Sequence, residues 1–218
     1  MGKELNLKNN IVNSILNHAR EHCEAVIDKA YEYFWDNNNP EEFMSGTALS
    51  LGFMNFEDWF VFDYKFNGAK ETLMDIHVRD NRCHSKEELE VINRTKNSLI
   101  SLYEVQSVSK EKRAIIKDLI LGGEFDLKDK ALTQGLKKGD IFATRLLDLD
   151  SKNIMSSCVY PFKPTQKKKV LAHIDKQFGR YKKNANPDGT MKDFLKDYGD
   201  LFNIIWMQLI RDEQKKED

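Results

Sequence analysis

The chain is short of the residues that break or restrain a backbone. Its 218 residues include 11 glycines, 4 prolines and 3 cysteines, and these form no low-complexity tract or repeat. Disorder is therefore expected only at the ends, above all in the charged tail DEQKKED that starts at Asp212. A chain of this length can bury a substantial core, as one large domain or two small ones.

Cysteines are few, and long apolar runs are missing. Cys23, Cys83 and Cys158 are odd in number and far apart, a pattern that fits reduced thiols in a cytosolic protein. No uninterrupted apolar run approaches the length of a membrane span, and the polar start MGKELNLKNN does not suit a signal peptide. We therefore expect a cytoplasmic protein that does not enter a membrane.

A dominant charge is also missing, because 34 basic residues face 35 acidic ones and the formal net charge is −1. Such a balance produces no overall field, so any preference for nucleic acid must come from a local patch. The hydrophobic content of 40% and the charged content of 32% are those of an ordinary soluble globular protein.

The first part of the chain, residues 1–98, has helical patterns. Apolar side chains recur every three or four positions over residues 5–35 and predict one long amphipathic helix. Asn39 suits the N-cap of a second helix, which Gly46 and Gly52 should keep short. Ser85, with Glu88 three positions later, has the capping box of a further helix.

The pattern changes over residues 99–162, where short β-rich runs alternate with turn formers. These runs are LISLYEVQSV, RAIIKDLIL, GEFDLKD, GDIFATRLLDLD and NIMSSCVYPF. About five strands at this spacing predict a small curled antiparallel sheet or a partly open barrel. Residues 163–218 then predict C-terminal helices that pack back on the rest, the last from Met191 to about Glu213 with Tyr198 among its buried side chains. The fold class is therefore α+β.

Residues 52–66, GFMNFEDWFVFDYKF, are unusually aromatic. The rings belong to Phe53, Phe56, Trp59, Phe60, Phe62, Tyr64 and Phe66. Their spacing fits a helical turn or two that passes into extended chain. We predict that the rings join the helices to the sheet as core, and the alternative is a groove for a partner's side chain. Glu57 and Asp63 must then point outward or be paired.

Five short motifs follow one another within residues 53–162. They are Trp59–Tyr64, Tyr103–Val105, Lys117–Leu119, Leu136–Asp140 and Arg145–Leu146. Their order resembles that of uncharacterised bacterial cytosolic proteins related to those with a zinc-binding SEC-C tail. The resemblance implies a bacterial origin and a fold, without an established reaction. The cysteine-rich tail is absent, because the residues after Cys158 include no cysteine and only one histidine, His173. The zinc site therefore does not carry over.

Two groups of side chains have metal-ligand chemistry. His18 and His22 stand four apart and can present two imidazoles to one metal, although both also flank the apolar stripe as ordinary amphipathic rings. His77, Cys83 and His84 form a second group without a paired CxxC. No nucleophile elbow or P-loop accompanies them. We predict no cofactor, and the sequence identifies no catalytic residue, although a catalytic site built from scattered residues would escape this reasoning.

The strongest local charge lies in residues 163–183, KPTQKKKVLAHIDKQFGRYKK, where eight basic residues face Asp175 alone. The candidate binding residues are Lys167, Lys168, Lys169, Lys176, Arg180 and Lys183. On a helix, Lys169, Lys176, Arg180 and Lys183 share one face, opposite the apolar Leu171, Ile174 and Phe178. Such a stripe predicts contact with nucleic-acid phosphates, and a merely solvated helix face explains it as simply.

The sequence thus favours a binding module that is not an enzyme and that contacts nucleic acid through this basic helix. A protein–protein adaptor or regulator is the first alternative, and it includes a homodimer formed through the aromatic segment or the last helix. The second alternative is an unrecognised metal-dependent enzyme that uses His18 and His22.

Overall fold

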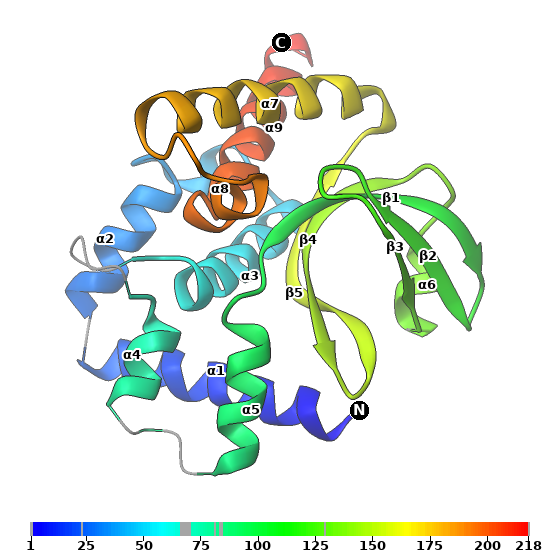
Figure 1. Ribbon diagram of the computed structural model, residues 1–218. Helices are drawn as coiled ribbons and strands as arrows, with labels where there is room; N and C mark the ends of the chain where they lie inside the picture. Colours follow the sequence, from blue (N-terminus) through cyan, green and yellow to red (C-terminus); the bar gives the residue numbers. More distant parts are fainter. Residues whose placement is uncertain are drawn as a thin grey trace.

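The computed structural model describes residues 2–22, 24–65, 71–80, 82, 85–128 and 130–217. Helices pack around a curled sheet, with both kinds of element contributing to the core (Figure 1). The elements are α1 (Lys3–His22), α2 (Glu24–Phe34), η1 (Pro40–Glu42), α3 (Gly46–Phe62), α4 (Leu73–Arg79), α5 (Lys86–Thr95), β1 (Ile100–Ser109), β2 (Arg113–Asp118), β3 (Glu124–Leu127), α6 (Lys130–Gly135), β4 (Ile141–Leu149), β5 (Lys152–Phe162), η3 (Pro164–Gln166), α7 (Lys167–Asn184), α8 (Met191–Asp197) and α9 (Leu201–Glu217). The predicted α+β class is confirmed.

All five predicted β runs form strands, which pair in the order β1-β2-β3-β5-β4. Because β4, the last strand in this order, also pairs with β1, the first, each strand has two neighbours. Neighbours are antiparallel except β3 and β5, which meet at the parallel pair Leu127–Asn153. An odd number of strands cannot form a closed order in which all neighbours are antiparallel. The sheet is therefore mixed, and the expectation of a wholly antiparallel sheet is wrong at that one pairing.

Both faces of the sheet carry buried side chains. Successive side chains of a strand point to opposite faces, so one strand contributes to two clusters. On β1, Leu102 belongs to the large core shared with the helices, whereas Tyr103 belongs to a smaller cluster on the other face. That cluster includes Ile116 and Phe142. The large core takes side chains from all three predicted regions, Phe56, Leu102 and Phe202 among them.

Helix α3 contains most of the aromatic segment. Phe56, Trp59, Phe60 and Phe62 are buried, which confirms for them the predicted core role. Phe53 is 38% exposed, so the prediction is wrong there. Tyr64 is half-buried, and Phe66 lies outside the described residues.

Helix α3 is also longer than expected, and Gly52 explains the error. A Cβ at this position would lie 2.6 Å from the ring of Trp35. Glycine here allows close packing of α3 against the residue that follows α2, and this packing outweighs the low helix propensity of glycine. The predicted caps are confirmed: the Asn39 side chain accepts from the Glu41 amide, and Ser85 and Glu88 form a capping box.

Two predicted helices are divided in the structure. The pattern over residues 5–35 covers α1 and α2, which run in different directions (Figure 1). The last predicted helix is divided into α8 and α9. The connection between them contains Gly199, where a Cβ would lie 2.5 Å from the Cβ of Asp63. Apolar periodicity continues through both bends, because each helix presents its own stripe to the same core. None of the described helices has the length and apolar character needed to cross a bilayer.

Asn55 fastens α3 to the sheet. Its fully buried side chain donates to the carbonyl of Val159 on β5 at 3.0 Å and accepts from the amide of the same residue at 2.7 Å. The side-chain amide thus replaces a neighbouring strand at Val159, which lies next to the irregularity in the pairing of β4 with β5. Both backbone groups of Val159 are satisfied by this one residue.

Replacing Asn55 with alanine should lower the free energy of unfolding by about 2 kcal/mol, because two backbone groups of the half-buried Val159 lose their partner. Urea denaturation measures the change. Asn13→Ala, at an exposed position of α1, is the matched control and should change stability by less than about 0.5 kcal/mol. Equal midpoints for the two variants would contradict this role of Asn55.

Candidate functional site

The basic segment forms α7, which lies at the outside of the fold and crosses α9 (Figure 1). Val170, Ile174 and Tyr181 are buried beneath it, and Leu171 and Phe178 are half-buried. The predicted apolar face therefore points to the core, as the helical spacing requires. The lysines and the arginine project from the remaining surface of the helix.

The six predicted binding residues have two different environments. The Lys167 ammonium lies 3.0 Å from a carboxylate oxygen of Glu104, and the Lys169 ammonium lies 2.8 Å from one of Asp212. Within the described part of the chain, no carboxylate pairs with the exposed side chains of Lys168, Lys176, Arg180 and Lys183. These four keep their full charge toward water.

A cavity of about 210 Å³ lies beside the basic side of α7. Helix α7 contributes His173, Gln177, Arg180 and Asn184 to one wall. Tyr198, at the end of α8, and Ile204, on α9, belong to the other. The cavity therefore has a polar, positively charged wall and an apolar, aromatic wall, and Arg180 belongs both to it and to the basic stripe.

Hydrogen bonds connect the side chains of the polar wall. Arg180 Nη1 donates to Gln177 Oε1 at 3.4 Å, and Gln177 Nε2 lies 3.2 Å from His173 Nε2. The pKa of His173 is lowered, first by partial burial and then by the charges of Lys176, Arg180 and Lys169. Three cations thus act on one imidazole, which indicates a positive potential at the cavity.

Tyr198 and Ile204 of the apolar wall are 42% and 46% exposed. The Tyr198 ring meets the Tyr181 ring edge-on, with 5.7 Å between centroids, so a buried neighbour sets its orientation. The prediction that Tyr198 is buried is wrong. Its φ of −116° and ψ of 57° take the chain out of the helix, and the ring leaves the apolar stripe.

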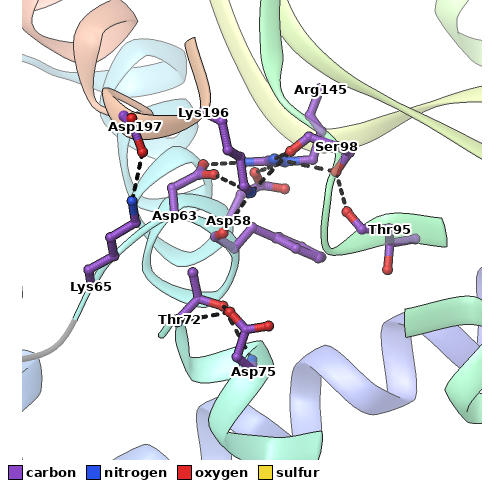
Figure 2. Close-up of polar contacts among 11 residues, drawn as sticks. Asp58, Asp63, Lys65, Thr72, Asp75, Thr95, Ser98, Arg145, Lys196 and Asp197 are labelled. Atoms are coloured by element: carbon purple, nitrogen blue, oxygen red, sulfur yellow. Dashed lines mark hydrogen bonds and ion pairs between the residues drawn. The ribbon is translucent and has the colours of Figure 1, made fainter. Parts of the chain in front are cut away.

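A buried ion network holds α8 in place (Figure 2). The fully buried Arg145 of β4 donates from Nε to Asp58 at 2.9 Å and from Nη2 to Asp63. Its Nη1 donates to the Ser98 carbonyl at 2.7 Å, and its guanidinium lies 4.9 Å from the centre of the Phe62 ring. The end of α3 is thereby joined to the sheet.

Lys196 extends this network to α8 (Figure 2). Its ammonium donates to Asp63 at 2.9 Å and to the carbonyls of Phe62 and Ser98 at 3.0 and 3.2 Å. Burial lowers the pKa of Lys196, and the charge of Asp63 opposes that shift. The next residue, Asp197, binds Lys65 and the Tyr181 hydroxyl, each at 2.9 Å. Tyr198 follows directly, so these contacts position one wall of the cavity.

Replacing Arg145 with methionine should lower the free energy of unfolding by about 3–5 kcal/mol, because Asp58 would lose its ion-pair partner in the core and Asp63 would keep only Lys196. Urea denaturation measures this. Arg113→Met, which removes an exposed ion pair with Asp126, is the control and should cost about 0–1 kcal/mol. An unchanged midpoint for Arg145→Met would show that the network contributes no stability.

The residues of the two metal hypotheses are only partly described. His18 and His77, which belonged to different hypotheses, line the same cavity of about 200 Å³ with Arg79 and Arg82. The side chains of His22, Cys83 and His84 lie outside the described residues. Among the side chains that are described, no group of three or more His, Cys, Asp or Glu residues has a metal-binding arrangement.

Comparison with known proteins adds one relationship. The model of a family of unknown function (DUF7986) matches residues 52–199. This segment includes the four charged members of the ion network, the whole of α7 and Tyr198. Searches of curated proteins and of solved structures found no match to this chain.

Proposed function

The chain belongs to this family of unknown function, and we propose that it binds nucleic acid through the basic face of α7, formed by Lys169, Lys176, Arg180 and Lys183. One observation carries the proposal: Lys176, Arg180 and Lys183 are exposed on one face of α7, no carboxylate among the described residues pairs with them, and Arg180 lines a cavity. Charges that share one helix face and lack acidic partners act together on a neighbouring phosphate.

Local charge is the relevant quantity here, since the whole chain has a formal net charge of −1. Charges are screened over about 8 Å at physiological ionic strength, so a phosphate at α7 experiences mainly the basic face. Each neutralised phosphate releases counterions, which makes the affinity fall steeply with salt. Lys169 is partly neutralised by Asp212, and the largest contributions should come from Lys176, Arg180 and Lys183.

Several expectations from the sequence stay predictions. They are the bacterial, cytoplasmic character of the protein, the resemblance to proteins related to those with SEC-C tails, and the lack of catalytic activity. The proposed binding requires none of them, because it depends only on the charge and shape of the α7 surface.

Changing Lys176 and Arg180 to glutamate should weaken binding to a fluorescein-labelled oligonucleotide by about tenfold or more at low salt, because attraction becomes repulsion. Fluorescence anisotropy at several salt concentrations measures it. Lys110→Glu with Lys112→Glu, in the turn between β1 and β2, makes the same change in net charge at exposed lysines away from α7. This control should bind like the wild type. Equal loss in both variants, or no binding by the wild type, would refute the proposal.

A second candidate, self-association, has support from one exposed apolar surface. Tyr33 and Ile204 line a cavity of about 600 Å³, and Ile204 also lines the smaller cavity with Tyr198. The three side chains are 60%, 46% and 42% exposed, respectively. Most other residues that line the larger cavity are polar or charged. Exposed apolar side chains with a polar rim are typical of interaction sites.

Light scattering tests the homodimer that this surface suggests. If the surface joins two copies, the wild type should have twice the monomer mass at micromolar concentration, and Ile204→Glu should be monomeric because a carboxylate would be buried in the interface. Leu89→Glu, at a 39% exposed apolar position on α5, should leave the mass unchanged. A monomeric wild type at all concentrations would remove this candidate.

A further inference from the structure

The cavity beside the basic face is suited to one planar, polar-edged ring. We infer that it receives a single unstacked nucleobase, so that the protein prefers single-stranded nucleic acid to duplex. The inference rests on the proposed function, and it adds the form of nucleic acid that the same surface selects.

The size of the cavity limits what can enter. Its volume of about 210 Å³ equals the volume that about seven water molecules occupy in liquid water. This is room for one heterocyclic ring system and too little for a base pair. A base in a duplex is stacked and paired, whereas a base in a single strand can turn out into a protein pocket.

The two walls match the two kinds of surface on a nucleobase. The exposed ring of Tyr198 and the side chain of Ile204 offer contact to the face of a base. Gln177 and Asn184, on the opposite wall, offer amide donors and acceptors to its edge. In the described structure the Asn184 side chain has no hydrogen-bond partner, and it remains available to a ligand. Stacking on an aromatic ring combined with edge contacts is the usual mode of single-strand recognition.

The charges are placed to hold the phosphates on either side of that base. Arg180 lines the cavity, and Lys176 and Lys183 lie four residues before it and three after it on α7. Both carboxylates near the turn between α8 and α9 already have partners: Asp197 binds Lys65 and Tyr181, and Asp200 accepts from the Tyr33 hydroxyl at 2.9 Å. An acidic peptide would satisfy the cations equally well, but it would not need the ring of Tyr198.

The test compares three ligands with equal numbers of phosphates per strand: a single-stranded oligonucleotide, its abasic counterpart and the duplex. Anisotropy should show that the wild type binds the single strand about 5- to 100-fold more tightly than the abasic strand. Tyr198→Ala should bind both alike, and Tyr198→Phe, which keeps the ring, should retain the preference. Asn184→Ala, which removes an amide from the polar wall, should also weaken the preference.

The variants separate this inference from the proposal on which it depends. Thermal melting checks that each variant is folded, and Asn184→Ala, at an exposed position, supplies the answer if Tyr198→Ala is unstable. Wild-type protein that binds single, abasic and duplex strands alike would overturn the base pocket and leave the basic face of α7 intact. Equal competition by polyglutamate of the same charge would overturn it in favour of an acidic protein partner. Absence of any binding to nucleic acid would overturn both.

Discussion

The fold depends on the buried guanidinium of Arg145 between the carboxylates of Asp58 and Asp63. Two carboxylates in a core are tolerated only with a cation that reaches both, and the planar guanidinium of arginine does so from one position on β4. Asp58 Oδ2 has no hydrogen-bond partner in the structure. The network is thus better understood as a constraint on arrangement than as a large source of stability, because it permits only one placement of α3 on the sheet.

The candidate site takes its shape from the same constraint. Lys196 joins Asp63 and so ties α8 to the network, and Gly199 lets the chain pass against the Asp63 side chain. The helix consequently ends at Tyr198, and the ring turns from the apolar stripe toward the cavity. The other wall comes from α7, whose position is set by the burial of Val170, Ile174 and Tyr181. One wall is therefore positioned by buried charge and the other by apolar packing.

On the described strands β2 and β3, basic residues have acidic neighbours. Arg113 on β2 forms an ion pair with Asp126 on β3 at 3.4 Å, and Lys117 lies directly opposite Glu124, so basic and acidic charges offset each other there. Small curled sheets of other proteins bind oligonucleotides, but a shared architecture does not carry a function without suitable side chains. The proposed nucleic-acid surface therefore consists of α7 and its cavity, and the strands support the helices.

Much of the local structure, and part of the site, followed from sequence alone. The Asn39 and Ser85 caps, the five strands and the basic stripe of α7 depend on neighbours within a few positions, where spacing determines geometry. The bends in two predicted helices, the partners of Arg145 and the exposure of Tyr198 depend on contacts between distant segments. Asp58 is 87 residues from Arg145, and Gly199 meets Asp63 only in the folded chain. Periodicity identifies which side of an element is apolar, but only tertiary packing decides which other element covers that side and where a cavity remains.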